Sequence, residues 1–302
     1  MSHDVSIILS TYLSDNYIEK YYYNCIKLIE NINIQLVHIL NDPTPKELEY
    51  KKKFFNLEAK KGKKNFQYKF LIVKRESLYA SWNRAINLSE SKFISISNID
   101  DIRYPLGLKS QISRIREYNE MVLLGSYFNV KTEDNLIIHD NTKNQKINRN
   151  DFFAGMYIGP FFMWSNPIFF KKKQIYFDEQ FYVAGDFDFQ IRFASVGKVE
   201  ILSENVGQYL NNVSGLSTGS ILQSIEGQVI YYRYNVVDKK LPLFSFLFFE
   251  KYEPFLIKIN SEKLPLNKVC SNLSIINRTN KKRKKNPIDY LNNIVTVIKM
   301  II

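Results

Sequence analysis

Two adjacent carboxylates, Asp100 and Asp101, follow an apolar run that is typical of a buried strand. Such a pair is costly to bury unless it binds a cation or caps a helix. A hard divalent ion on a diphosphate needs only one or two protein carboxylates, because phosphate oxygens and water supply its other ligands. The pair therefore indicates either a divalent-metal site or a capped turn that leads into a helix beginning at Leu106.

A second acidic pair, Asp186 and Asp188, precedes apolar residues that are spaced as one face of a helix over about 189–197. Aspartate at this place commonly caps the N-terminus of a helix. A helix N-terminus lowers the pKa of a carboxyl group, whereas burial raises it. The two effects on the pKa of Asp186 therefore oppose each other.

The elements that position the first pair belong to an alternating pattern. Apolar, β-branched runs over residues 5–9, 34–40, 68–73 and 93–97 are separated by stretches whose apolar residues have helical spacing. The second of these stretches opens with a capping box from Thr44 to Glu47. This order predicts an α/β fold with a mostly parallel sheet flanked by helices.

The residues just past each predicted strand are polar or charged. They are residues 10–12, 41–42, 74–75 and 98–101. In an open parallel sheet, ligands bind outside the carboxyl ends of the strands, which all meet at one edge. We therefore expect these four segments to form one binding site.

Beyond Pro105 the pattern changes. A helix over about 106–118 precedes strand-like segments, and residues 133–135 are typical of a hairpin turn into 136–138. We expect one α/β domain over residues 1–220, with halves 1–105 and 106–220. A small helical C-terminal extension with a basic segment is expected over 221–302.

Several segments together resemble family 2 glycosyltransferases, which have the Rossmann-like GT-A fold. The similar segments are residues 5–12 (first strand and nucleotide-facing loop), 40–42 (base-reading strand end), 81–86 (a helix that usually reads A-R-N-x-G), 97–105 (the metal-binding D-x-D region) and 177–192 (the acceptor-side acidic block). The likeness covers about residues 4–220, and its motifs occur in the family's order and spacing.

This resemblance implies roles for individual residues. Asp100 and Asp101 would be the metal ligands for Mg²⁺ or Mn²⁺ on the donor diphosphate, and Asp186 would be the catalytic base. Trp164 and Asp188 would lie on the acceptor side, with a place in the core as the alternative for Trp164. The nucleotide-sugar-binding residues would be Ser10, Thr11, Tyr12, Asp42, Arg75, Asn83, Asn98 and Asp101.

Some positions depart from the family's pattern. Asn98 replaces the first acid of D-x-D. Trp82 and Ala85 replace the usual arginine and glycine, and Gly185 replaces a glutamate. Metal binding would then depend mainly on Asp100. Lys74, Arg75 and Arg103 are the basic candidates for the diphosphate, and a plain surface charge is the alternative for each.

The net charge of +12 needs a partner or an explanation, and nucleic acid, an anionic membrane surface and plain solvated charged faces are the alternatives. No zinc finger, helix-turn-helix or aromatic RNA-binding strand accompanies it, so nucleic acid is not expected. Basic residues within 277–286 beside apolar-periodic residues 290–302 suit an anionic membrane surface, and a helix docked on the domain is the alternative. Without a secretory signal or an apolar stretch of ~20 residues, we expect a cytoplasmic protein. It would be either soluble or peripheral on the cytoplasmic face of the inner membrane.

The resemblance implies an inverting glycosyltransferase of polysaccharide biosynthesis. It would move a sugar from a UDP- or dTDP-sugar to a hydroxyl of a glycan or lipid-linked acceptor. A nucleotidyltransferase of similar fold is one alternative, although that class usually has a glycine-rich loop with a lysine after the first strand, which this chain lacks. A non-catalytic basic binding module is the other, and its binding would fall steeply with salt.

Overall fold

The computed structural model describes residues 3–132, 135–138, 144–148, 151 and 158–211, together with 223, 226, 227 and 230. The chain forms two compact units, Met1–Phe177 with Phe189–Asn212, and Asp178–Asp188 with Val213–Ile302. The predicted helical extension and its basic segment lie outside the described residues, apart from the four positions just named. They stay predictions, as does the domain boundary at residue 220.

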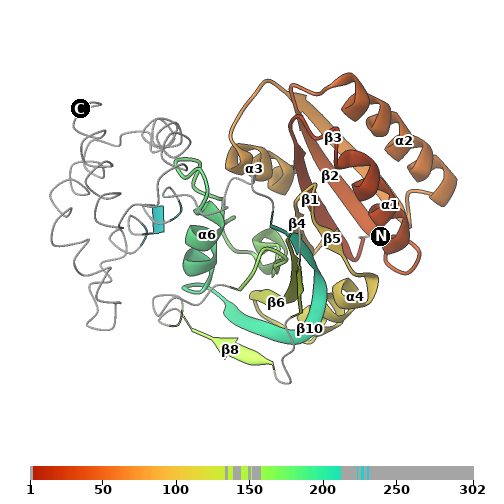
Figure 1. Cartoon of the computed structure of the whole chain (residues 1–302). Helices are drawn as coiled ribbons and strands as arrows, with labels where there is room; N and C mark the ends of the chain where they lie inside the picture. Colours follow the sequence, from red (N-terminus) through yellow and green to blue (C-terminus); the bar gives the residue numbers. More distant parts are fainter. Residues whose placement is uncertain are drawn as a thin grey trace, which may run out of the picture. The chain divides into compact units, whose positions relative to one another are not determined.

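The first unit is built on the parallel sheet that the alternating pattern predicts. Strands β1 (Val5–Thr11), β2 (Ile34–Asn41), β3 (Phe66–Val73) and β4 (Phe93–Ser97) run parallel in the order β3-β2-β1-β4. Helices α1 (Ile18–Leu28), α2 (Pro45–Lys61) and α3 (Leu78–Leu88) connect them and flank the sheet (Figure 1). The expected α/β architecture is confirmed, and the carboxyl ends of all four strands lie at one edge.

Side chains of β1 alternate between two covered faces, as in other parallel sheets. Val5, Ile7 and Leu9 belong to the core cluster that also contains Tyr21 of α1 and Phe54 of α2. Helix α3 contacts β1 and β2. Because both faces of the sheet are covered, β1 has a near-continuous apolar sequence.

Helix α2 begins with the predicted capping box. The Thr44 hydroxyl accepts the Glu47 backbone N–H at 3.1 Å, and the Glu47 carboxylate accepts the Thr44 N–H at 2.8 Å. Pro45 follows in the first turn, where an N–H would have no partner within the helix. Glu47 also accepts the Ser14 N–H at 3.1 Å, which ties the start of α2 to the loop after β1.

His38 of β2 is fully buried between two hydroxyl groups. Its Nε2 lies 2.9 Å from the Thr11 hydroxyl, and its Nδ1 lies 3.0 Å from the Tyr68 hydroxyl. Burial lowers the pKa of His38 to about 3, so the ring is neutral at physiological pH. His38 therefore has a structural role, because it joins β1, β2 and β3.

The sheet continues beyond β4 with strands that the sequence predicts only in part. They are β5 (Ile102–Arg103), β6 (Val122–Lys131), β9 (Met163–Ser165) and β10 (Lys198–Leu210), in the order β4-β9-β6-β10-β5. Strand β9 is antiparallel to β4 and β6, whereas β6 and β10 are parallel to each other. Neither β9 nor β10 is predicted from the sequence, because β9 is short and β10 mixes polar and apolar residues.

The remaining described elements of the first unit are α4 (Pro105–Arg116), β7 (Leu136–Ile137), β8 (Gln145–Ile147) and the 3₁₀ turn η1 (Pro167–Phe170). Strand β7 pairs antiparallel with β6, as the predicted hairpin requires, while residues 133 and 134 of its turn lie outside the described part of the chain. Among the described helices, none is long and apolar enough to cross a membrane.

Helix α6 (Gly185–Phe193) begins in the second unit, within Asp178–Asp188. Asp186 and Asp188 occupy its first turn, as predicted. The helix ends at Phe193 rather than at Gly197, because residues 194–196 form a turn. The acidic pair therefore lies at the N-terminal end of a short helix.

Candidate functional site

Three residues from different strand ends meet: Tyr12 after β1, Asp42 after β2 and Arg75 after β3. The Arg75 guanidinium lies over the Tyr12 ring, 3.4 Å from its centroid. The Asp42 carboxylate accepts the Arg75 backbone N–H at 2.9 Å. All three residues are exposed, Tyr12 to 40%. They form an open cluster of an aromatic ring, a carboxylate and a cation, which we call the strand-end clamp.

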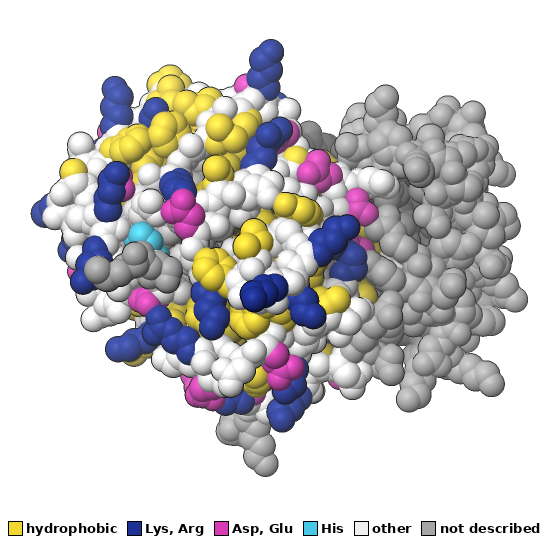
Figure 2. Space-filling view, turned by 180° about the vertical axis from the view of Figure 1, so that it is seen from behind, with side chains coloured by type: hydrophobic (Ala, Val, Ile, Leu, Met, Phe, Trp, Pro, Cys, Tyr) yellow, Lys and Arg dark blue, Asp and Glu magenta, His cyan; other side chains and the backbone are white. Residues whose placement is uncertain are grey.

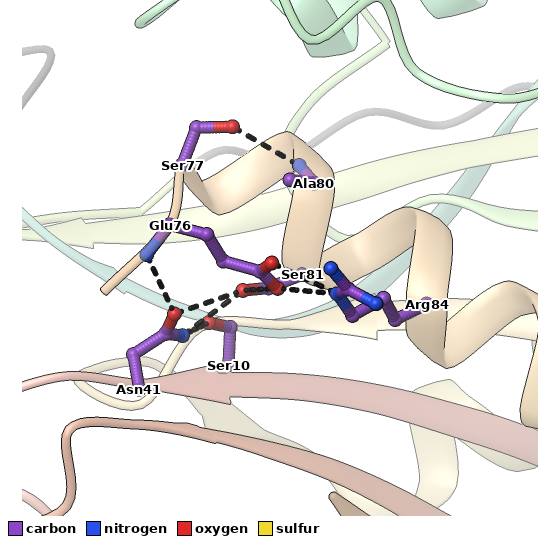
Figure 3. A network of polar contacts seen from close by, with 7 residues as sticks. All are labelled: Ser10, Asn41, Glu76, Ser77, Ala80, Ser81 and Arg84. Atoms are coloured by element: carbon purple, nitrogen blue, oxygen red, sulfur yellow. Dashed lines mark hydrogen bonds and ion pairs between the residues drawn. The ribbon is translucent and has the colours of Figure 1, made fainter. Parts of the chain in front are cut away.

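Asn41, at the end of β2, joins the strand ends through its buried amide (Figure 3). Its Nδ2 donates to the Ser10 hydroxyl at 3.0 Å and to the Ser81 hydroxyl at 2.9 Å. Its Oδ1 accepts the Glu76 backbone N–H at 3.3 Å. One side chain thus connects β1, β2, α3 and the loop after β3.

The same network supports the clamp from its two sides. Asn41 precedes Asp42 in the chain, and Glu76 follows Arg75, so the hydrogen bond between Asn41 and Glu76 fixes both neighbours. Glu76 also forms an ion pair with Arg84 at 2.8 Å (Figure 3). The sequence motifs include Asn41 as a polar strand end without a role of its own, and they do not include Glu76. The available signal is a polar side chain at the buried end of an apolar strand.

The two carboxylates of residues 98–101, which we call the acidic turn after β4, have different surroundings. Asp101 is 3% exposed, its Oδ1 accepts the Leu210 N–H at 3.1 Å, and its Oδ2 accepts the Asn98 Nδ2 at 3.0 Å. Burial, followed by the neighbouring Asp100 carboxylate, raises the pKa of Asp101 to about 7. Asp100 is only half-buried. Asp101 therefore holds the turn together, while Asp100 is the carboxylate that a ligand can reach.

The two acids do not cap α4, which was the alternative for them. The N-cap residue of this helix is Tyr104, and its side chain makes no capping hydrogen bond. The turn is instead held from α1, where Asn24 donates to the Arg103 C=O at 2.8 Å and accepts the Arg103 N–H at 3.0 Å.

Arg103 is neither a surface charge nor a group that can reach a diphosphate, so both interpretations of it are corrected. It is 1% exposed, and its guanidinium donates to Gln111 Oε1 at 2.9 Å, to the Ile96 C=O at 3.1 Å and to the Ser95 hydroxyl. Burial lowers the pKa of Arg103 to about 10, which leaves it charged at neutral pH. It is a fixed buried cation that interacts electrostatically with Asp101.

Two residues predicted to contact the nucleotide-sugar have side chains bonded elsewhere. The Thr11 hydroxyl is buried against His38. The Asn83 amide donates to the Phe177 C=O at 2.9 Å and accepts the Phe177 N–H at 2.8 Å. The predicted side-chain contacts are therefore corrected, since Thr11 supports the sheet and Asn83 anchors the backbone at Phe177.

Trp164 is a core residue, and its prediction as an acceptor-side platform is wrong. Its side chain is fully buried in β9. Its ring lies 5.5 Å from that of Phe162, 5.1 Å from that of Phe189 and 6.3 Å from that of Phe177, between ring centroids. With aromatic neighbours around it, the indole has no face on which a sugar can stack.

Asp186 and Asp188, the second acidic pair, also differ from each other in burial. Asp186 is half-buried, and its Oδ1 accepts the N–H of the next residue, Phe187, at 2.8 Å. Asp188 is fully buried, which argues against direct contact with an acceptor. The Ala184 C=O accepts the Asp188 N–H at 3.1 Å, so Ala184 rather than Asp186 is the N-cap residue.

The residues of the acidic turn fit a divalent ion that a substrate shares. Within the described part of the chain, no group of three or more His, Cys, Asp and Glu side chains could hold a metal by itself. A metal on a diphosphate needs fewer protein ligands, and carboxylate oxygens are the type that Mg²⁺ and Mn²⁺ prefer. The half-buried Asp100, supported by the fixed Asp101, supplies that ligand type.

The surface charge is distributed rather than concentrated on the face shown in Figure 2. Lys and Arg side chains lie scattered there among hydrophobic and uncharged ones. A basic patch or stripe is the usual footprint of a nucleic-acid-binding protein. The expectation that nucleic acid is not a partner stays a prediction.

Comparison with known proteins relates this fold to glycosyltransferases. No protein-family model matches the chain. An uncharacterized glycosyltransferase of Methanocaldococcus jannaschii is 27% identical over 216 residues, which are 68% of this chain and 70% of that protein.

Solved structures share the fold at low sequence identity. TarS 1–349 of S. aureus in complex with UDP-GlcNAc has a TM-score of 0.61 and 16% identity, covering 79% of this chain and 68% of that one. The mannosyltransferase PcManGT from Pyrobaculum calidifontis, in complex with GDP-Man and Mn²⁺, has a TM-score of 0.57 and 11% identity, covering 99% and 81%. The chain therefore has the fold of these transferases.

Proposed function

We propose that the protein is a glycosyltransferase that moves a sugar from a nucleoside-diphosphate sugar to a hydroxyl of a glycan or lipid-linked acceptor. One observation carries this proposal. The strand-end clamp and the acidic turn lie at the same edge of a parallel sheet, the edge where such sheets bind ligands. The relative and the two structural neighbours, which are a glycosyltransferase and complexes with UDP-GlcNAc and GDP-Man, support it.

The strand-end clamp has the chemistry to hold a nucleobase. An aromatic ring and a guanidinium offer flat surfaces on which a base can stack. The Asp42 carboxylate can accept a hydrogen bond from a base N–H. Asp42 has a positive φ of 39°, and the Asn41 network holds its backbone in that strained conformation.

The acidic turn would carry the diphosphate end of the donor. Mg²⁺ or Mn²⁺ held by Asp100 would neutralise charge on the diphosphate oxygens. Asp101 keeps the turn in place through Leu210 and Asn98. Asn98 therefore acts on the site through Asp101.

Asp186 would be the base for the acceptor. Its carboxylate would take the proton of the acceptor hydroxyl as the oxygen bonds to the anomeric carbon of the donor sugar. The bond from that carbon to the diphosphate oxygen breaks, and its electron pair leaves with the diphosphate. Attack opposite the leaving group would invert the anomeric centre. The proposed setting of this transfer is polysaccharide biosynthesis at the cytoplasmic side of a membrane.

A thermal-shift screen tests the donor class. With UDP, dTDP or GDP in excess and Mn²⁺ present, we expect one nucleotide to raise Tm by several degrees, because a ligand at 100 times its Kd adds about 2.7 kcal/mol and each kcal/mol is worth roughly 2–4 °C in a chain of this size. Tyr12→Ala should remove the shift. Tyr23→Ala is the matched control, since Tyr23 is a 57% exposed tyrosine on α1.

The outcomes separate the three hypotheses. No shift with any nucleoside diphosphate would contradict the proposal and favour a basic binding module. A shift with nucleoside triphosphates alone would favour a nucleotidyltransferase. An equal loss of the Tm shift in Tyr12→Ala and Tyr23→Ala would contradict the role of the strand-end clamp in nucleotide binding.

A further inference from the structure

Glu226 is a fully buried carboxylate that the proposed reaction does not use. Its Oε1 accepts the Tyr182 N–H at 2.7 Å, and its Oε2 accepts the N–H groups of Val183 at 2.8 Å and Ala184 at 2.7 Å. Burial of a carboxylate is costly unless hydrogen bonds compensate, and bonds to an ionised acceptor are the strong ones. Three consecutive amides on one carboxylate therefore form a specific anchor for residues 182–184.

The anchored segment leads directly into α6. The Ala184 C=O accepts the Asp188 N–H at 3.1 Å, which is the first hydrogen bond of this helix. Glu226 thus binds the N–H of the residue whose carbonyl opens α6. Asp186 lies two residues further along, in the first turn. A displacement of Ala184 would therefore displace Asp186.

The residue that opens α6 has no side chain that could serve as this anchor. Helices usually begin at Ser, Thr, Asp or Asn, whose side chains accept an N–H of the first turn. Ala184 stands at this position and has no side-chain acceptor. The anchor comes instead from a residue 42 positions away in the chain.

We propose that Glu226 is a positioning residue that fixes Asp186 for abstraction of the acceptor proton. This inference rests on the proposed function, in which Asp186 is the base. A general base must lie within about 2.6–3.2 Å of the oxygen whose proton it takes. A misplacement of about 1 Å by a distant substitution can lower the rate on the order of 100-fold.

The test compares Glu226→Gln with the native full-length enzyme. Glutamine keeps the size of the side chain but places an NH₂ group where an oxygen accepts backbone N–H groups. We expect kcat to fall by about 10-fold to 100-fold, with the donor KM and the nucleotide Kd unchanged. Amide hydrogen exchange should increase in residues 182–188, because their anchor is weakened.

Two further variants make the result specific. Glu226→Asp keeps the charge with a shorter reach and should restore part of kcat. Glu200→Gln makes the same change at another buried carboxylate, which accepts from Arg114 and Tyr118. That control should lower Tm without the selective loss of kcat.

Each outcome decides the inference. A native kcat in Glu226→Gln despite faster exchange in residues 182–188 would overturn the positioning role, as would parallel losses of kcat, nucleotide affinity and Tm. If Glu226→Gln does not fold, a native kcat in Glu226→Asp together with faster exchange there would overturn it. Absence of transfer by the native enzyme is a separate result, which would overturn the proposed function itself.

Discussion

Replacement of Asp100 by alanine is expected to lower kcat for sugar transfer by roughly 1000-fold, because a catalytic metal supplies several kcal/mol of charge stabilisation and each ~1.4 kcal/mol is a factor of ten. Asp100 is the half-buried acid of the turn after β4, and Asp101 is committed to Leu210 and Asn98. Loss of Asp100 should therefore remove a ligand without loosening the turn. The measurement is kcat at saturating donor and Mn²⁺, with Tm recorded alongside.

Two controls show whether this effect belongs to Asp100. Glu120→Ala removes an exposed carboxylate that pairs with Lys198, and it should leave kcat and Tm nearly unchanged. Asp101→Ala should lower Tm, because it leaves the partly buried Leu210 N–H at the end of β10 without its acceptor. A native kcat in Asp100→Ala would exclude Asp100 as a ligand of a catalytic metal.

Asp186→Asn is expected to lower kcat by about 100-fold to 10,000-fold, the usual contribution of a general base. Asparagine keeps the shape of the side chain and can still accept the Phe187 N–H that Asp186 accepts at 2.8 Å. It cannot take a proton from the acceptor. Donor KM and nucleotide affinity should therefore stay near the native values, and the measurement is a kcat and KM comparison at saturating acceptor.

A neighbouring aspartate provides the control for Asp186. Asp178→Asn makes the same change in the same segment, where Asp178 accepts the Gln180 N–H at 3.0 Å. This variant should retain the native kcat. Equal kcat values for Asp186→Asn and the native enzyme would exclude Asp186 as the base, and equal losses in both variants would point to a general effect on the segment.

The sheet and its ligand-binding edge follow from the sequence because they depend on local patterns. The apolar runs of β1 to β4 and the helical spacing between them predict a mostly parallel sheet. Parallel strands end at one edge, and the strand order β3-β2-β1 then brings Tyr12, Asp42 and Arg75 together. Hairpin chemistry likewise predicts β7. These features need no knowledge of distant contacts.

The side-chain roles that failed depend on distant partners. Thr11 faces His38, and Asn83 binds the Phe177 backbone 94 residues away. Arg103 can be buried because Ser95 and Gln111 accept hydrogen bonds from its guanidinium. The local sequence around a charged residue does not show such partners. A motif gives the position of a residue along the chain, but the direction of its side chain is set by packing.

Trp164 illustrates the same limit for aromatic residues. Its sequence context, between apolar and polar neighbours, suits both a platform and a core position. Trp164 is a core residue because the rings of Phe177 and Phe189, from other segments of the chain, pack against its indole. The difference between Asp100 and Asp101 has the same origin, because the partner of Asp101 is the end of β10, a strand that local patterns do not predict.

The most direct test of the nucleotide-sugar site is a crystal structure with a nucleoside diphosphate and Mn²⁺, with the metal located by its anomalous signal. We predict an anomalous peak within coordination distance of a carboxylate oxygen of Asp100 and of the diphosphate. The base should stack at Tyr12 and Arg75, with Asp42 accepting one of its N–H groups. A metal bound away from Asp100, or a nucleotide bound away from the ends of β1 to β4, would contradict the account.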